Sequence, residues 1–221
     1  MKKKIFMMLF LLVSLTANAQ QTFKAMGKDV SFGMRGGITT SYLTNNDNSD
    51  GKMGWCFGVD FTVPFDEVCK NFSVQPSVLF VSKGDVLSQD GDVGDGDYAN
   101  TEATINAVYM EIPITAAYKI QLGRRFNITL NTGPYIAFGL GGKSKLETNA
   151  TIGGSPISGG FDKGTFESCK RFDYGWVFGI RYGFTKTLSA GVQFDLGMCN
   201  TAKEDGKEKN FAGLLYVGWT F

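Results

Sequence analysis

Residues 107–120 read AVYMEIPITAAYKI, and apolar and polar or small side chains alternate along this stretch. Val108, Met110, Ile112, Ile114, Ala116 and Tyr118 share one face. Tyr109, Glu111, Pro113, Thr115, Ala117 and Lys119 share the other. A period of two places successive side chains on opposite faces of a β-strand. The stretch therefore predicts a strand with one oily face and one wet face.

Seven further segments bounded by turn residues show the same alternation: 31–43, 54–63, 72–83, 126–141, 171–185, 188–197 and 211–221. Strands of about ten residues with this pattern are typical of membrane barrels. A soluble barrel would have to pack its bulky aromatic face into a narrow core, which eight strands do not provide. We predict an all-β fold, an eight-stranded antiparallel up-and-down transmembrane β-barrel over residues 31–221.

The connections between these segments alternate between long and short, beginning with a long one. Outer-membrane barrels have short periplasmic turns and long external loops, and an even strand number puts both termini in the periplasm. Pro113 and Pro134 lie inside strands, where a missing donor disturbs the ladder, and we interpret them as bulges. Localisation in the outer membrane follows from this pattern.

The first residues combine Lys2, Lys3 and Lys4 with an apolar run and the small-residue site Ala17-Asn18-Ala19. This predicts a secretory signal peptide over 1–19, followed by a periplasmic segment over 20–30. Its removal leaves 19 basic and 21 acidic residues, a net charge of −2, so nucleic acid is not an expected partner. The chain has no His, which excludes Ser-His and Cys-His catalysis, and we expect no enzyme activity and no cofactor.

The wet faces carry charges of both signs: Arg35, Asp60, Lys83, Glu111, Lys119, Asp173, Arg181 and Asp195. Buried charges must be paired, and we expect an ion network in the lumen that contains Arg35, Asp60, Glu111, Lys119, Arg181 and Asp195. A first loop centred near Asn48 would put Arg35 opposite Thr62 and diagonal to Asp60, within reach of an ion pair. A structural ladder and a functional proton path both fit this pattern.

Two further sets of residues suggest weaker sites. The second long loop is acidic, and Asp90, Asp92, Asp95 and Asp97 could bind a divalent ion loosely, although their spacing is not that of a calcium loop. Cys169 and Cys199 flank the sixth and seventh segments on the outer side, so a disulfide between them is possible.

Three stretches carry a family resemblance: YMEIPITAAYK (109–119), TGPYIAFGLGGK (132–143) and RFDYGWVFGIRYGF (171–184). Together with the terminal aromatic residue, they resemble the PorT-like outer-membrane β-barrel family typical of Bacteroidota. The resemblance implies that the last strand, with Trp219 and Phe221, is the signal read by the barrel-insertion machinery. It also implies a link of one family member to protein secretion.

We expect a monomeric, non-enzymatic barrel that acts through its external loops in surface contact, adhesion or envelope organisation. The expected partners are outer-membrane lipid and lipopolysaccharide, the insertion machinery, and envelope or secretion proteins. A small channel or a secretion-associated barrel is the main alternative, and a membrane enzyme is a third.

Overall fold

The computed structural model describes residues 23–25, 27–44, 49–94, 97–123, 126–152, 155–202 and 207–221. Its elements are β1 (Phe23–Ala25), β2 (Lys28–Thr44), β3 (Lys52–Pro64), β4 (Phe72–Gly94), β5 (Asp97–Leu122), β6 (Phe126–Gly141), β7 (Lys143–Ile152), β8 (Ser155–Gly164), α2 (Thr165–Ser168), β9 (Phe172–Gly183), β10 (Leu188–Asn200) and β11 (Lys209–Thr220). The predicted signal peptide lies outside these residues. Within them, no helix has the length and apolar character needed to cross a membrane.

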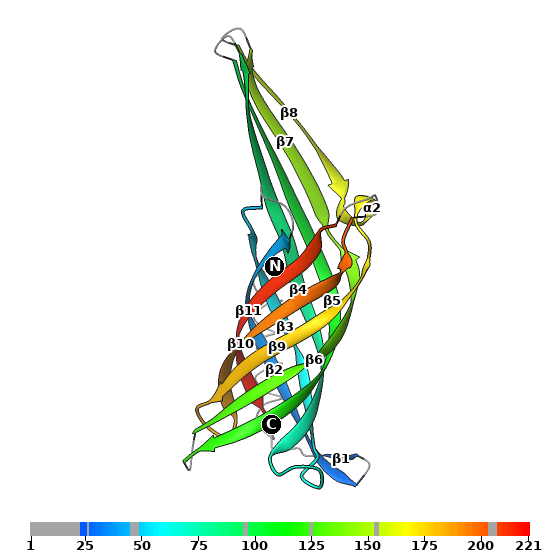
Figure 1. Cartoon of the computed structure of the whole chain (residues 1–221), viewed down its shortest axis with the longest axis vertical. Coiled ribbons are helices and arrows are strands. Elements are labelled where there is room, and N and C mark those ends of the chain that lie inside the picture. The colour runs from blue at the N-terminus through cyan, green and yellow to red at the C-terminus, as the bar shows by residue number, and fades with distance from the viewer. Residues whose placement is uncertain are drawn as a thin grey trace, which may run out of the picture.

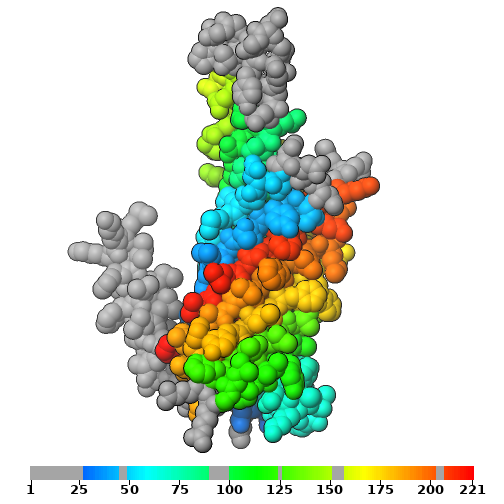
Figure 2. Space-filling model, turned by 60° about the vertical axis from the view of Figure 1, so that its left-hand side comes forward, coloured from blue at the N-terminus to red at the C-terminus, as the bar shows by residue number. Residues whose placement is uncertain are grey.

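Eight strands close into a ring in the order β4-β3-β2-β11-β10-β9-β6-β5, and β4 pairs with β5 to complete it. Every pairing between neighbours is antiparallel. The strands tilt around the long axis of the molecule (Figures 1 and 2), as closure of a small barrel requires. The predicted eight-stranded antiparallel barrel is confirmed.

Each predicted segment lies within one strand of the ring or overlaps it closely. The β5–β6 pairing keeps one register from Tyr109 to Leu122, and β6–β9 keeps one register through Pro134. The bulges expected at Pro113 and Pro134 are therefore wrong. The irregularity in the β5–β6 pair lies instead between Val108 and Tyr109, at the external end of the barrel.

The two faces of the ring differ as the alternation predicts. Large apolar side chains point outward and remain about half exposed, as do Ile114, Ile136 and Val217. Inward positions carry Gly, Ser, Thr, Tyr and charged residues, most of them buried. An apolar exterior around a polar interior suits a barrel surrounded by lipid.

Strands β4 and β5 continue far beyond the ring, where we expected loops. Residues 84–94 of β4 pair with residues 97–106 of β5, β5 pairs with β7, and β7 pairs with β8. The four strands form a sheet that rises from one end of the barrel (Figure 1), opposite the end that holds β1 and the C-terminus. The sequence of this extension lacks regular alternation because both of its faces lie outside the lipid.

The N-terminal part differs slightly from the expectation. Residues 23–25 form β1, which pairs with the start of β2, and β2 begins at Lys28 rather than at Ser31. The segment expected to precede the barrel is thus partly an extension of its first strand.

Candidate functional site

The lumen is crossed by ion pairs, and the first of them centres on Asp60. Arg35 Nε lies 3.2 Å from Asp60 Oδ1, and Arg181 Nη2 lies 3.3 Å from Asp60 Oδ2. Ser77 Oγ also donates a 2.7 Å hydrogen bond to Asp60 Oδ1. The Asp60 side chain is only 7% exposed. The two cations and the hydroxyl offset the free-energy cost of removing this carboxylate from water.

The register behind this pair differs from the expected one. Arg35 lies opposite Gly58 rather than Thr62, and Asp60 lies opposite Gly33. The expected register was wrong because the first loop was centred too late. Asp60 is nevertheless a diagonal neighbour of Arg35, because it lies two residues after Gly58, the residue opposite Arg35. In the expected register it lay two residues before the opposite residue, Thr62. Both diagonal positions are within reach of an arginine.

A second set of ion pairs centres on Lys83 of β4. Its Nζ lies 2.7 Å from Glu111 Oε2 and 3.5 Å from Asp195 Oδ2. The three side chains come from β4, β5 and β10, and each is at most 1% exposed. One ammonium group therefore holds two carboxylates from opposite walls of the barrel.

Gln193 joins the two sets. It accepts a 2.7 Å hydrogen bond from Arg35 Nη1 at its Oε1 atom and donates one of 2.7 Å from Nε2 to Asp195 Oδ1. A continuous polar chain thus runs from Arg181 through Asp60, Arg35, Gln193, Asp195 and Lys83 to Glu111. Buried networks of this kind polarise and rigidify one another.

Tyrosine rings fill the space around the network. The Arg35 guanidinium lies 4.9 Å from the Tyr216 ring centre, and Lys83 Nζ lies 4.8 Å from that of Tyr135. The hydroxyl of Tyr135 donates a 3.2 Å hydrogen bond to Asp173 Oδ2, which Asn210 Nδ2 also reaches at 3.0 Å. These rings add cation–π contacts to the network.

Of the six predicted network residues, the structure brings together Arg35, Asp60, Glu111, Arg181 and Asp195. Lys119 is an exception: it is exposed at the periplasmic opening and forms no ion pair with a described residue. It faces inward, but it lies too near the end of β5 to be enclosed. Lys83, a wet-face charge that was not included in the expected network, is the buried cation that pairs with Glu111 and Asp195.

Asp85 of β4 lies fully buried at the external mouth of the barrel. It accepts hydrogen bonds from the Leu43 amide at 2.9 Å, the Ser49 hydroxyl at 2.7 Å and the Gly51 amide at 3.1 Å. Asp85 therefore anchors residues around the first external loop to β4.

The helix α2 closes another part of the mouth. Its Phe166 ring packs edge-on against Tyr109 at 5.6 Å, and Thr165 Oγ1 donates a 2.5 Å hydrogen bond to the Asn106 carbonyl. The Arg171 guanidinium lies 4.8 Å from the Phe166 ring centre. The side chains leave a cavity of about 10 Å³ beneath this cap.

A larger polar cavity of about 90 Å³ opens at the periplasmic end. Hydroxyl and amide side chains line it together with Lys119, Arg181 and Lys186. The network above it separates this cavity from the external mouth.

The four cysteines are thiols, and no disulfide joins Cys169 to Cys199. Cys169 packs against the cluster of Tyr109, Tyr135 and Phe166, and its backbone bridges to Ala202. The Cys199 thiol donates to the Asn200 carbonyl at 3.6 Å instead. The expected disulfide is therefore not formed in the structure.

The candidate metal ligands were Asp90, Asp92, Asp95 and Asp97. Asp95 and the side chains of the other three lie outside the described residues. Among the residues that are described, no group of three or more His, Cys, Asp or Glu could hold a metal ion.

The external sheet has one apolar row and one polar face. Directly paired residues share a face, and the pairing places one row of four apolar residues across β4, β5, β7 and β8: Leu87, Ala103, Leu146 and Phe161. The neighbouring row on the opposite face contains Ser88, Glu102, Glu147 and Gly160. This polar face continues the lipid-facing side of the barrel, which turns polar on β5 between Val108 and Asn106. The sheet therefore lies beyond the lipid.

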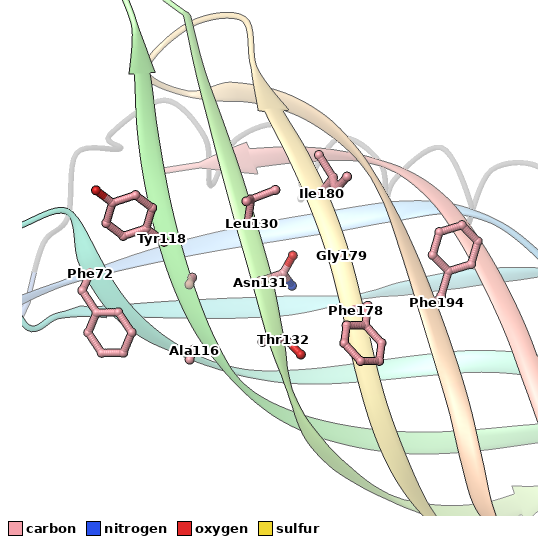
Figure 3. Close-up of a pocket in the computed structure, with 11 residues that line it drawn as sticks. Phe72, Ala116, Tyr118, Leu130, Asn131, Thr132, Phe178, Gly179, Ile180 and Phe194 are labelled. Carbon is pink, nitrogen blue, oxygen red and sulfur yellow. The ribbon is translucent and has the colours of Figure 1, made fainter. Parts of the chain in front are cut away.

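The lipid-facing wall carries a depression of about 550 Å³ that is lined by residues of β4, β5, β6, β9 and β10. Figure 3 shows Phe72 and Tyr118 on one side and Phe178, Ile180 and Phe194 on the other. Small side chains, including Ala116 and Thr132, lie between them. Its apolar walls fit acyl chains.

The C-terminal aromatic residue, which follows β11, contacts β2. The Phe221 ring stacks on Phe32 with centres 5.3 Å apart, and the Phe221 amide donates a 2.8 Å hydrogen bond to the Phe32 carbonyl. Trp219 points outward from β11 and is half exposed. Both aromatic residues therefore lie where the last strand meets the first.

Solved structures that are similar to this chain include small bacterial barrels. The attachment invasion locus protein Ail of Yersinia pestis is 12% identical, with 86% of this chain and 98% of that chain covered and a TM-score of 0.40. Neisserial surface protein A is 12% identical, with 86% and 97% covered and a TM-score of 0.38. The N-terminal barrel domain of Pseudomonas aeruginosa OprF is 12% identical, with the same coverage and a TM-score of 0.34. The chain matches no curated protein.

Residues 18–203 match the family described as outer membrane protein beta-barrel domain. The match covers most of the eight-stranded ring and the whole external sheet, and it agrees with the apolar outer wall. The chain therefore belongs to the outer membrane protein beta-barrel domain family.

Proposed function

We propose that this outer-membrane barrel is a non-enzymatic surface-recognition protein in which the ring is a membrane anchor and the external sheet makes the contact. One observation carries this proposal: buried side chains occupy the lumen, while β4 and β5 continue outward and form an external sheet with β7 and β8. A side-chain-filled interior suits an anchor, and binding residues commonly lie on segments held by a rigid scaffold.

The sheet is larger than a barrel needs for closure. Its β7–β8 hairpin pairs over ten residue pairs, from Lys143 with Gly164 to Ile152 with Ser155, and none of these residues belongs to the ring. Ordering these strands costs conformational entropy, and burial in the membrane does not offset that cost because the hairpin lies outside the ring. A role in contact with molecules outside the cell accounts for this arrangement.

The alternative from the sequence, a small channel or a PorT-type secretion-associated barrel, needs a path or a docking partner. Ion flow would have to cross the Lys83 and Asp60 clusters, whose charges are paired and buried. Planar-bilayer recording tests this alternative directly. We expect no stable openings, and large conductance would favour the channel.

The positive test removes the hairpin. A variant lacking residues 143–164, with Gly142 joined to Thr165 by a short Gly-Ser linker, retains all eight ring strands. We expect it to reach the membrane and to shift on gels after boiling as the full chain does. Cells that display it should lose the attachment to surfaces or other cells that the full chain confers. Equal attachment by both chains would contradict the proposal.

A further inference from the structure

The external sheet ends in an open edge. In the described residues β8 pairs only with β7, so the backbone groups along its other side have no strand partner. Natural proteins usually protect such edges with lysine, proline or bulges. β8 carries Pro156 and Lys163 near its two ends, but its central residues 157–162, Ile-Ser-Gly-Gly-Phe-Asp, have neither, and its pairing with β7 has no irregularity.

Two apolar side chains stand on this edge. Ile157 is 55% exposed and Phe161 is 60% exposed, and both lie on the face of the sheet that carries the apolar row. Gly159 lies between them on the same face, and a Cβ atom there would meet nothing within 4 Å. The edge thus presents two apolar anchors, the side chains of Ile157 and Phe161, with no side chain between them at Gly159.

The anchors are arranged symmetrically about Gly159. If a second β8 strand pairs antiparallel with the first, with the two Gly159 residues opposite each other, each Ile157 faces the Phe161 of the other copy. Apolar cross-strand pairs of this kind stabilise a sheet. A two-fold axis is the commonest symmetry of protein dimers and requires such self-complementarity.

The direction of β8 determines where the two barrels lie. The strand runs from the far end of the sheet at Ser155 back to the barrel at Gly164 (Figure 1). Antiparallel pairing of two copies therefore places their barrels at opposite ends of one eight-stranded sheet. Two copies in one membrane point the same way and cannot pair like this, whereas copies in two facing membranes can.

We propose that the β8 edge binds the β8 edge of a second copy of this chain in a facing membrane, joining two membranes by strand pairing. This inference rests on the proposed surface function and names its partner. Pairing along the nine residues 155–163 would hold the two barrel mouths about 30 Å apart.

Vesicle tethering tests the proposal. The full mature chain is reconstituted into two populations of phosphatidylcholine vesicles that carry donor and acceptor lipid dyes. We expect energy transfer when both populations carry the protein and background transfer when one lacks it. The double variant Ile157→Lys with Phe161→Lys places like charges opposite each other and should reduce tethering about tenfold or more. Asn149→Lys on the inner strand β7 adds an exposed charge away from the edge and should leave tethering unchanged.

A cross-link fixes the register. Gly159→Cys, in a chain that also carries Cys69→Ser and Cys199→Ser, should form a reducible dimer only when both vesicle populations carry it, because directly opposite positions suit a disulfide. Asn149→Cys in the same background should remain monomeric. Wild-type tethering to protein-free vesicles, or tethering unaffected by the double lysine variant, would overturn the proposal.

The two proposals fail in different ways. If vesicles stay dispersed while removal of residues 143–164 still abolishes attachment of cells to another surface, the second-copy partner is wrong and the surface function stands. If hairpin removal changes no attachment at all, the surface function itself is wrong.

Discussion

Arg35 and Asp60 form a buried ion pair although neither lies directly opposite the other across β2 and β3. Asp60 also binds Arg181 from β9, so one carboxylate links three strands of the ring. Removal of the carboxylate leaves Arg35 and Arg181 without an acidic partner, whereas removal of Arg35 leaves Asp60 with Arg181 and the Ser77 hydroxyl.

We therefore expect Asp60→Ala to destabilise the barrel more than Arg35→Ala. Loss of one partner from a buried pair costs about 3–5 kcal/mol, and the first variant lies toward the upper end of that range. Urea unfolding of the chain in lipid vesicles measures both values. The double-mutant cycle should give a coupling energy above about 1 kcal/mol. Coupling near zero would mean that water screens the pair.

Lys83 is expected to be the most sensitive single cation in the lumen. Lys83→Met leaves Glu111 and Asp195 facing each other without a counter-charge, and it should lower the free energy of unfolding by about 3–5 kcal/mol. Adding Glu111→Gln should recover part of this loss, because only one carboxylate then remains charged.

Lys119→Met supplies the matched control. Lys119 is exposed at the periplasmic opening and pairs with no described acid, so its replacement should change stability by less than about 0.5 kcal/mol. Equal effects of the two substitutions would contradict the assignment of Lys83 as the central cation.

The ring could be predicted from the sequence because one physical rule governs every strand: lipid outside and a narrow polar lumen inside force a period of two. The wet faces also pointed to Arg35, Asp60, Glu111, Arg181 and Asp195 as lumen residues. The structure contains the predicted Arg35–Asp60 pair although the predicted register is wrong, because a residue has two diagonal neighbours, one on each side of the residue opposite it.

The external sheet could not be predicted in this way. Water surrounds both of its faces, so the strands from Gly84 to Gly94 and from Ser155 to Gly164 need no alternation, and their Gly and Asp content resembles that of loops. Asp85 and Gln193 act through partners on distant strands, and a single sequence does not reveal which strands face each other across the lumen.

The C-terminal aromatic residue is expected to matter for assembly. Phe221 stacks on Phe32 at the seam between the last and first strands. From the family resemblance we predict that this end is the signal for insertion. Phe221→Ala should lower the fraction of chain that shows the boiled-versus-unboiled gel shift in outer-membrane fractions. Phe184→Ala, a rim aromatic on another strand end, is the control and should leave that fraction nearly unchanged.

Gly139 is expected to hold the external cap in place by lacking a side chain. A Cβ atom at Gly139 would lie 2.2 Å from Phe166 Cζ, whereas one at Gly141 would meet nothing within 4 Å. Gly139→Ala should therefore displace Phe166 and α2 from the barrel mouth and increase trypsin cleavage after Lys170 several-fold, since cleavage follows the population of locally opened chain. The gel shift of the barrel should persist, because the clash lies in the cap rather than in the ring. The Gly141→Ala variant should be cleaved at the same rate as the wild type. Adding Phe166→Ala to Gly139→Ala should remove the clash but should not restore the cap. Identical cleavage of the Gly139 and Gly141 variants would show that Phe166 does not occupy the mouth.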